Sequence, residues 1–301
     1  MDLRSYLIRS GYWVHENGTL LPPLVNKHSM QIIRNFDHSV EKTLTYLVGY
    51  PNSGSCWVKY MMWNIMLQEH PSMLNEVDNM LRRNIIFTTL EYSSPETGEP
   101  NHQEVSHMLV QCPFQLVIST NLSRDIAPKI VPNQQNKAVF LVRNPKDVCV
   151  ATLKALLSEK ELQSRRDFEK YAMEFLEGHV PFGSWLDHTL SWWNHFKSRS
   201  NYLFLTYEEV RNDMRGTIQK LAKFMEKPLS KETTTAICKK CCLSVVPWKE
   251  CRKEKDDFLE SINAGPVDEW KDYFTVTLTE KFDEILKPKL AAVGLLDKMN
   301  F

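Results

Sequence analysis

The sequence predicts an α/β fold in which a central parallel β-sheet is flanked by helices in a three-layer arrangement. Short apolar runs alternate along the chain with segments of helical periodicity, which is the pattern of parallel strands joined by crossover helices. In addition, the apolar runs at 44–50 and 138–142 lead directly into residues typical of a tight loop or of a helix start. These two observations predict the fold class before any motif is considered.

The predicted strands differ in how clearly they stand out. Residues 44–50 form the first strand, and a Pro-Asn-Ser-Gly loop follows it. Residues 138–142 form the clearest strand, because all of them are apolar and a run of this kind is typical of a strand buried on both faces. The other strands are predicted at 114–120 and 201–206.

Helices are predicted from apolar periodicity and from their end signals. At the helix predicted from residue 145, Asn144 can cap the first turn, Pro145 suits the first position and Asp147 favours the helix dipole. An apolar helical stripe covers residues 60–67, in a helix that opens at about Ser55. The predicted helices after the second strand are at about 145–157, 166–177, 184–199, 213–226 and 278–293. Segments 71–113 and 243–269 are irregular, and we expect them to form lids.

The size and charge of the chain limit its possible function. We expect residues 1–301 to form a single domain with a full core. Lys+Arg and Asp+Glu both number 37, so no net field attracts nucleic acid or an anionic membrane. The first ten residues have no continuous apolar core and no small-residue cleavage site, so we expect no signal peptide. No apolar run approaches the ~20 residues that span a bilayer. We therefore expect a cytoplasmic protein that recognises its ligand at a local site.

The cysteines indicate reduced thiols, because there are seven of them and no secretory signal accompanies them. Cys238 and Cys241 have the spacing of zinc ligands. However, no second Cys-x-x-Cys and no His pair follows at the distance found in zinc fingers. Ordinary thiols on a helix are the favoured interpretation, a metal site is the alternative, and we expect no metal.

Residues 50–57 predict a phosphate-binding loop. A tight loop between a strand and a helix presents backbone N–H groups to an anion at the helix N-terminus. Gly54 lets the backbone approach a phosphate closely, while Ser53 and Ser55 add hydroxyl donors. Asn52 stands in the middle of this loop, where a cation would be expected.

Other polar residues follow the strands at the edge where ligands bind in open α/β sheets. These strand ends are 50–57, 121–123, 143–144 and 207–208. Arg143 comes directly after an apolar strand and just before a helix, a position that suits a bidentate phosphate contact. The alternative for Arg143 is a salt bridge to a neighbouring carboxylate, and we favour phosphate.

These motifs resemble the cytosolic sulfotransferase family over about residues 44–285. The opening loop of the family is Tyr-Pro-Lys-Ser-Gly-Thr-Thr-Trp, where this chain has Tyr50-Pro-Asn-Ser-Gly-Ser-Cys-Trp57. The second signature of the family, Arg-Asn-Pro-Lys-Asp, is intact at 143–147. Further matches are Gly183-Ser184-Trp185, Trp192-Trp193, Tyr207-Glu208-Glu209 and, at 271–280, the dimerisation segment Lys-x-x-x-Thr-Val-x-x-x-Glu.

The resemblance implies a P-loop-like fold and a reaction. Members of the family transfer a sulfuryl group from 3′-phosphoadenosine 5′-phosphosulfate (PAPS) to a hydroxyl or amine of a small molecule, leaving adenosine 3′,5′-bisphosphate. The residues implied to bind the cofactor are Ser53, Gly54, Ser55, Cys56, Trp57, Arg143, Tyr207 and Gly265. Trp57 would stack on adenine and Tyr207 would lie beside it, although Trp57 also suits a core aromatic. The resemblance further implies a homodimer through Lys271, Thr275, Val276 and Glu280.

The chain departs from the family at both catalytic positions. Asn52 replaces the lysine that neutralises charge on the transferring group, and Asn121 replaces the histidine that takes the proton of the acceptor. Asn can hydrogen-bond a hydroxyl, but it is not a general base near neutral pH, and loss of such a base costs about 10²–10⁴-fold in rate. Family contacts to the cofactor are also replaced at Ala151, at Asn263-Ala264, at Asp268 and at about Cys241-Cys242-Leu243.

Two functions are consistent with these departures. The first is a PAPS-dependent sulfotransferase with weak or atypical activity. The second is an inactive family member that binds a nucleotide or a small molecule, or that acts through its dimer surface. Side chains that could replace the missing groups are His102, His107, Lys59, Arg124 and Lys129. Apolar residues of the first lid suggest a small apolar acceptor, or simple packing under the lid: Met73, Leu74, Met80, Leu81, Phe87 and Tyr92.

Overall fold

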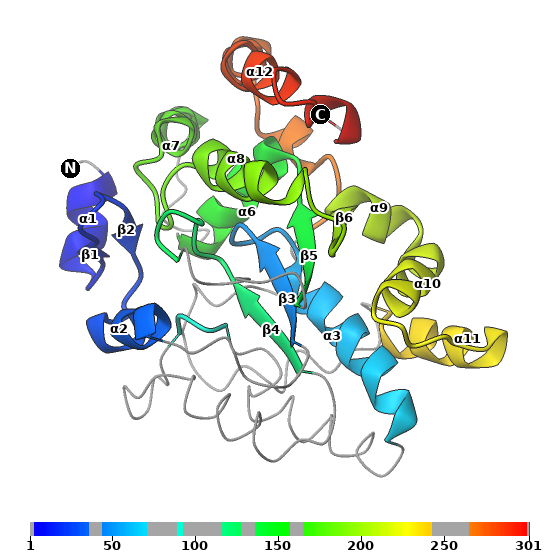
Figure 1. The fold of residues 1–301 in the computed structure, drawn as a ribbon. Helices are drawn as coiled ribbons and strands as arrows, with labels where there is room; N and C mark the ends of the chain where they lie inside the picture. The colour runs from blue at the N-terminus through cyan, green and yellow to red at the C-terminus, as the bar shows by residue number, and fades with distance from the viewer. Residues whose placement is uncertain are drawn as a thin grey trace.

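The computed structural model describes residues 3–35, 44–70, 89–92, 116–127, 136–156, 165–242, 265–299 and 301. Figure 1 shows a sheet near the centre of these residues, with helices on its flanks. The strands of this sheet are parallel and follow the order β4-β3-β5-β6. The predicted fold class, a central parallel sheet flanked by helices, is therefore confirmed.

The strands agree with the predicted ones to within two residues at either end. They are β3 (Leu44–Gly49), β4 (Leu116–Thr120), β5 (Lys137–Val142) and β6 (Tyr202–Thr206). β3 and β4 are buried along their whole length; β3 pairs with strands on both sides, and β4 pairs with β3. This burial explains why the sequence of each strand is mostly apolar rather than alternating.

All the predicted helices are present: α3 (Ser55–Met66), α6 (Pro145–Leu156), α7 (Arg165–Glu177), α8 (Trp185–Phe196), α10 (Met214–Phe224) and α12 (Val276–Ala291). Helix α11 (Lys231–Lys240) carries Cys238, and a helix was the favoured interpretation of this cysteine segment. The structure adds helices that were not predicted from the sequence: α1 (Leu3–Arg9), α2 (Lys27–Asn35) and α9 (Tyr207–Asn212). It also adds the hairpin strands β1 (Trp13–Val14) and β2 (Leu20–Leu21) and the 3-10 turns η1 (Leu67–Glu69), η3 (Glu269–Asp272) and η4 (Leu296–Lys298). The added elements are short, and α9 and α11 begin at side-chain caps from Thr206 and Ser230.

Most of the two predicted lids lies outside the described residues. Residues 89–92 of the first lid and 265–269 of the second are described. Within the described part of the chain, no helix has both the length and the apolar character needed to cross a bilayer.

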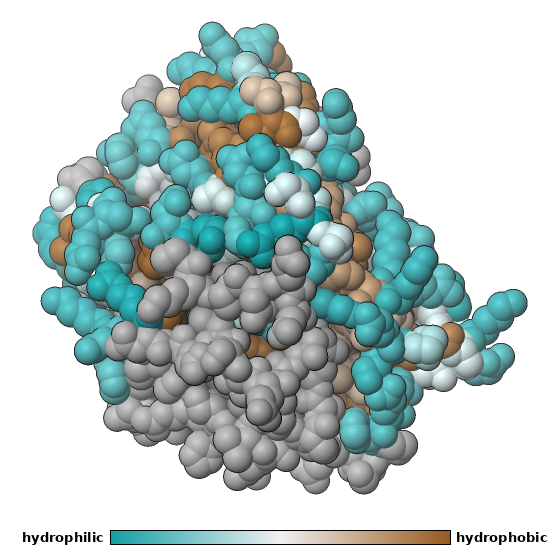
Figure 2. All heavy atoms as spheres, viewed as in Figure 1, coloured by the Kyte–Doolittle hydropathy of each residue, from teal (hydrophilic) through white to brown (hydrophobic). Residues whose placement is uncertain are grey.

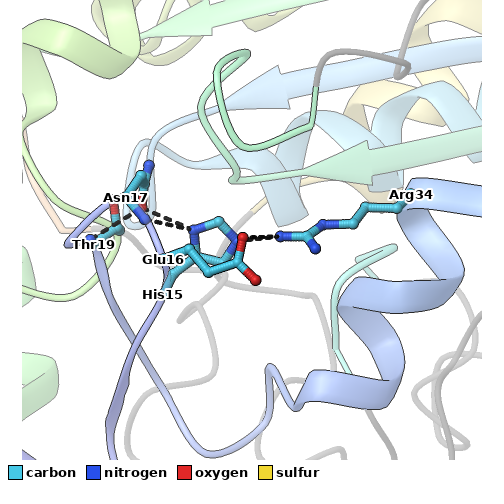
Figure 3. Close-up of polar contacts among 5 residues, drawn as sticks. All are labelled: His15, Glu16, Asn17, Thr19 and Arg34. Atoms are coloured by element: carbon cyan, nitrogen blue, oxygen red, sulfur yellow. Dashed lines mark hydrogen bonds and ion pairs between the residues drawn. The ribbon is translucent and has the colours of Figure 1, made fainter.

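A polar network around His15 closes the N-terminal hairpin (Figure 3). The Nδ1 atom of His15 lies 2.9 Å from Oδ1 of Asn17, and its Nε2 lies 3.0 Å from a guanidinium nitrogen of Arg34 on α2. Because a guanidinium group only donates, Nε2 of His15 is the acceptor in this contact. The N–H of Phe182 donates to the carbonyl of Leu20 at 2.8 Å. The network therefore joins α2 to the hairpin, and the hairpin to the loop before α8.

Helix α8 holds the segment that follows β4. The Nε1 of Trp192 donates to the carbonyl of Leu122 at 2.9 Å. One turn earlier, His188 is buried with its ring edge-on to that of Tyr50, at a centroid distance of 5.4 Å, and beside the backbone of Asn121. The buried imidazole of His188 thus lies beside Tyr50, which follows β3, and Asn121, which follows β4.

This imidazole predicts a pH dependence of stability. Burial lowers the pKa of His188 to about 3, because the charged ring would lose its hydration. Below its ordinary value of 6.5 the unfolded chain binds a proton at this residue that the folded chain does not bind. Stability from the neutral ring is therefore present above that pH and is lost as the pH falls. We expect a loss of about 1 kcal/mol in the free energy of unfolding between pH 6 and pH 5 from this group.

Urea unfolding at several pH values measures this loss. The variant His188→Gln, which keeps a polar side chain but does not titrate, should lose about 1 kcal/mol less stability over the same interval. Equal losses in the two proteins would mean that His188 titrates normally in the folded state.

Candidate functional site

The parallel register brings the polar strand ends to one edge of the sheet. Val48 is paired with Thr120, Gly49 with Leu141 and Val142 with Thr206. The residues that follow these strands are therefore level with one another: Tyr50, Asn121, Arg143 and Tyr207. This edge is where the sequence placed the ligand site.

The loop after β3 has the backbone of an anion-binding loop. Asn52 and Gly54 have φ angles of 61° and 91°, in the left-handed region, which Asn and Gly tolerate best. Gly54 is the N-cap of α3 and offers no side chain to its first turn. Ser53 is fully buried, and its Oγ has no hydrogen-bond partner among the described residues. A buried hydroxyl donor at a helix start without a side-chain cap fits a phosphate oxygen.

Tyr207 packs against this loop from the end of β6. A Cβ atom at position 54 would lie 2.5 Å from Cδ2 of Tyr207, so packing as well as φ requires glycine there. The hydroxyl of Tyr207 donates to the carbonyl of Gly265 at 2.6 Å. Tyr207 therefore joins the loop to the segment that precedes α12.

Trp57 has the contacts of a core aromatic in this structure. It is buried, its Nε1 donates to the carbonyl of Cys241 at 2.8 Å, and its ring meets that of Tyr207 edge-on. The alternative that the sequence left open, packing in the core, is thus seen directly. Stacking of Trp57 on adenine stays a prediction.

Arg143 bridges the loop and the C-terminal segment. Its two terminal nitrogens donate to the carbonyls of Asn52 and Pro266, each at 3.0 Å, and its guanidinium carbon lies 4.4 Å from the ring centroid of Tyr207. The side chain is fully buried. Burial lowers the pKa of Arg143, whereas Tyr207, Asp147 and other nearby acidic groups favour its charged form. Phosphate contact and a salt bridge were the two roles considered from the sequence, and the structure adds a backbone-bridging role.

The two positions that the resemblance assigns to catalysis, Asn52 and Asn121, are both buried and both hydrogen-bonded. The Nδ2 of Asn52 donates to Oγ1 of Thr152 on α6 at 3.3 Å. The Nδ2 of Asn121 donates to the hydroxyl of Tyr92 at 3.1 Å, and its backbone N–H donates to Oε1 of Glu91 at 2.6 Å. Each asparagine is therefore fixed in place as a neutral amide.

Several acidic residues around this edge make contacts that were not predicted from the sequence. Glu208 accepts the backbone N–H of Asn144 at 2.9 Å, and burial raises the pKa of its carboxyl to about 7. The carboxylate of Asp147 accepts the N–H groups of Asp268 and Trp270, each at 2.9 Å. The intact family signature at 143–147 indicated that Asp147 belongs to the site. No feature of the sequence indicated a role for Glu91, which lies in an irregular segment.

The candidates for replacing the missing groups divide into placed and unplaced residues. Lys59 is buried and donates from Nζ to Oγ of Ser119 at 2.7 Å, two residues before Asn121. The guanidinium carbon of Arg124 lies 5.9 Å from the ring centroid of Trp192. The remaining candidates lie outside the described residues, as do other positions named from the sequence: His102, His107, Lys129, Asn263, Ala264 and Leu243.

The cysteines behave as ordinary thiols where they are described. Cys238 and Cys241 are both free, and burial raises the pKa of each. In the described part of the chain, no cysteine belongs to a group of three or more possible metal ligands.

Comparison with known proteins identifies the family. The sulfotransferase domain model matches residues 42–294. The chain belongs to the sulfotransferase family. It is 26% identical over 275 residues to the amine sulfotransferase of Oryctolagus cuniculus, covering 87% of this chain and 85% of that protein. It is 29% identical over 261 residues to sulfotransferase 1B1 of Mus musculus, covering 82% of each chain.

Solved structures of sulfotransferases share the fold. The structure of mouse sulfotransferase SULT7A1 complexed with PAP has a TM-score of 0.71 at 21% identity and covers 95% of this chain and 99% of that one. A retinol dehydratase in complex with androsterone and the inactive cofactor PAP has a TM-score of 0.67 at 18% identity, with 95% and 93% covered. The sulfotransferase fold predicted from the sequence is thus confirmed.

The contact between Gly54 and Tyr207 predicts a large cost for a side chain in the loop. Gly54→Ala should lower the free energy of unfolding by about 2–4 kcal/mol, since left-handed strain adds to overpacking against the ring. Gly18→Ala is a matched control, because Gly18 has a φ of 89° and no atom within 4 Å of the added Cβ. It should cost about 1–2 kcal/mol. Urea unfolding measures both, and equal costs would mean that Tyr207 moves away from the loop without penalty.

Proposed function

We propose that this sulfotransferase-family protein binds the 5′-phosphosulfate end of PAPS in loop 50–57 and transfers its sulfuryl group only slowly. The observation that carries the proposal is the buried Ser53 hydroxyl, which has no partner among the described residues and lies beside a helix start without a side-chain cap. The surrounding donors suit phosphate or sulfate oxygens. Bound PAPS would supply the sulfuryl group, and the loop would hold the phosphate that leaves.

Slow transfer follows from the groups present at the two strand ends. In-line transfer depends on positioning and on charge stabilisation, and a base must accept the proton of the acceptor. The amides of Asn52 and Asn121 can orient oxygen atoms, but they supply neither positive charge nor a proton acceptor. At positions 52 and 121 the chain therefore retains groups that can position oxygen atoms, but not the charge and the base expected to provide most of the rate.

We propose a small apolar hydroxyl- or amine-bearing acceptor. Support comes from the names of similar proteins, which include an amine sulfotransferase and structures that hold androsterone or retinol. We also propose that the protein is cytoplasmic and that residues 1–301 form a single domain, in keeping with the long match to the family model.

The Ser53 hydroxyl gives a clean test of nucleotide binding. Because its Oγ has no partner among the described residues, Ser53→Ala should leave stability within about 0.5 kcal/mol of the unmodified protein. Affinity for adenosine 3′,5′-bisphosphate, measured by calorimetry, should fall about tenfold through loss of a charge-assisted hydrogen bond. Ser191→Ala is the matched control. Its hydroxyl accepts the N–H of Arg124, so this variant should lose stability without losing affinity.

Unchanged affinity in Ser53→Ala would contradict the proposed loop contact. No binding by the unmodified protein at millimolar nucleotide would contradict the function as a whole.

A second test restores the missing groups. Asn52→Lys combined with Asn121→His should raise sulfuryl transfer from PAPS by about 10²–10⁴-fold, because a charge and a general base return. Labelled PAPS with androsterone or a simple phenol as acceptor provides the assay. Asn52→Gln combined with Asn121→Gln is the control, and it should stay at the starting rate. A repaired protein at the rate of this control would show that the donor or the acceptor is not held in line.

We propose a homodimer through Lys271, Thr275, Val276 and Glu280. Thr275 caps α12 through its side chain, and Val276 is 76% exposed at the first turn of that helix. Figure 2 shows apolar surface gathered over the end of the molecule that carries α12. An exposed valine at a fixed helix start is consistent with a surface that a second copy covers.

Light scattering at micromolar concentration tests the dimer. Val276→Glu should yield monomers, because a buried unpaired charge opposes association. Ile285→Glu is the control, since this residue is also exposed on α12 but lies about two and a half turns further along, on the opposite face of the helix. A monomeric unmodified protein, or a dimer that survives Val276→Glu, would contradict the proposal.

A further inference from the structure

Lys59 is a buried lysine on the helix that follows the phosphate loop. It lies in the second turn of α3 and is 1% exposed. Its Nζ donates to Oγ of Ser119 at 2.7 Å, where α3 packs against β4. Lysine is rarely buried to this extent, because the ammonium group loses its hydration. A cation buried in this way serves an ion pair, a functional site or both.

The position of Lys59 connects the two ends of the proposed reaction. Along α3, Lys59 is four residues, or about 6 Å, from Ser55 at the end of the phosphate loop. Its side chain starts out towards the loop, because Cα–Cβ bonds in an α-helix tilt towards the N-terminus. Its partner Ser119 precedes Asn121 by two residues, about 7 Å in an extended chain. The ammonium group therefore lies between the loop and the strand end at Asn121.

The strand end that Lys59 contacts is also held by a neighbouring segment. The N–H of Leu90 donates to the carbonyl of Ser119 at 2.9 Å, and Glu91 accepts the N–H of Asn121 at 2.6 Å. Glu91 is fully buried. An ammonium group and a carboxyl group thus contact β4 or the residue after it, two residues apart. This arrangement fixes the ammonium group of Lys59 beside the position at which the acceptor would lose its proton.

Two other cations around this edge are directed away from β4. The terminal nitrogens of Arg143 donate to the carbonyls of Asn52 and Pro266. The guanidinium group of Arg124 lies against the ring of Trp192 on α8, at 5.9 Å from its centroid. Lys59, in contrast, directs its charge to the end of β4. It is therefore well placed to act on a group that passes between the loop and Asn121.

We propose that the ammonium group of Lys59 is a catalytic group, which contacts the oxygens of the sulfuryl group during transfer and supplies positive charge that Asn52 does not. This inference rests on the proposed function. In the transfer step, a bond forms between sulfur and the acceptor oxygen or nitrogen. The bond between sulfur and the 5′-phosphate oxygen breaks, and its electron pair stays on that oxygen. The proton of the acceptor passes to water, and Lys59 stays protonated throughout.

A fixed cation at this place stabilises the transition state more than the bound donor. Charge shifts during the transfer onto the oxygens between sulfur and the 5′-phosphate, and a preorganised charge beside them needs no rearrangement at that moment. Transfer stays slow all the same, because Asn121 cannot take the proton of the acceptor. Lys59 thus accounts for a residual rate and not for a full one.

Sulfuryl transfer from labelled PAPS to a simple phenol tests the role of Lys59. Lys59→Met, which keeps an unbranched apolar stem, should lower kcat about 10²-fold. Affinity for adenosine 3′,5′-bisphosphate, measured by calorimetry, should change less than about threefold, because this product carries no sulfuryl group. Lys137→Met is the matched control. Lys137 is 18% exposed and pairs with Glu226 at the opposite edge of the sheet, so kcat should stay within about threefold.

Two further variants separate a catalytic from a structural role. Ser119→Asp places a carboxylate against the ammonium group, which keeps Lys59 in place but offsets its charge. We expect kcat to fall at least about tenfold while the urea midpoint is unchanged or higher. In the Asn52→Lys background, Lys59→Met should cost less than about threefold in kcat, because position 52 then supplies the charge. A purely structural role would give the same cost in both backgrounds.

Two results would overturn the inference while leaving the proposed function intact. One is a Lys59→Met protein that transfers at the unmodified rate. If this variant does not fold, an unmodified rate in Ser119→Asp has the same meaning. The other is an equal loss with and without Asn52→Lys. If transfer by the unmodified protein is below detection, the comparison is made in Asn121→His, and equal rates with Lys59 and with Lys59→Met there overturn the inference. Absence of nucleotide binding by the unmodified protein would instead contradict the proposed function, and the inference with it.

Discussion

The buried guanidinium group of Arg143 is the interaction on which the site depends. It donates to the backbone on both sides, at Asn52 and Pro266, and its face lies on the ring of Tyr207. A buried cation is stable only when its donors are satisfied and acidic groups are near. The carboxylates of Asp147 and Glu208 meet the second condition. Arg143 therefore links the loop and the C-terminal segment, which Tyr207 also joins through the carbonyl of Gly265.

In the proposed function, this arrangement separates binding from catalysis. The parts that position a phosphate are backbone features, namely the left-handed residues at 52 and 54 and the start of α3, together with the Ser53 hydroxyl. The parts that would accelerate transfer are side chains, and at Asn52 and Asn121 they are neutral amides with structural partners. Backbone geometry survives substitution of these side chains, because Asn accepts the φ of position 52. A family member can in this way keep the loop while losing the charge and the base.

The sequence was sufficient to predict features that depend on neighbouring residues in the chain, namely the strands and the residues that directly follow them. The strands were predicted because buried parallel strands are apolar, and Tyr50, Arg143 and Tyr207 could be placed at one edge because each directly follows a strand. The roles of Glu91 and His188 could not be predicted. Each reaches the site from a distant segment, and its partner is a backbone group or a ring that no periodic pattern encodes. The same holds for Trp57, whose contact with Cys241 depends on how α11 packs against α3.

A crystal structure of the protein with adenosine 3′,5′-bisphosphate tests the central claim most directly. The account predicts that the 5′-phosphate lies in loop 50–57, within hydrogen-bond distance of Oγ of Ser53 and of the backbone N–H groups that open α3. It also predicts that Arg143 keeps its contact with Asn52 when the nucleotide is bound. A nucleotide bound elsewhere at saturating concentration, with Ser53 still without a partner, would contradict the account.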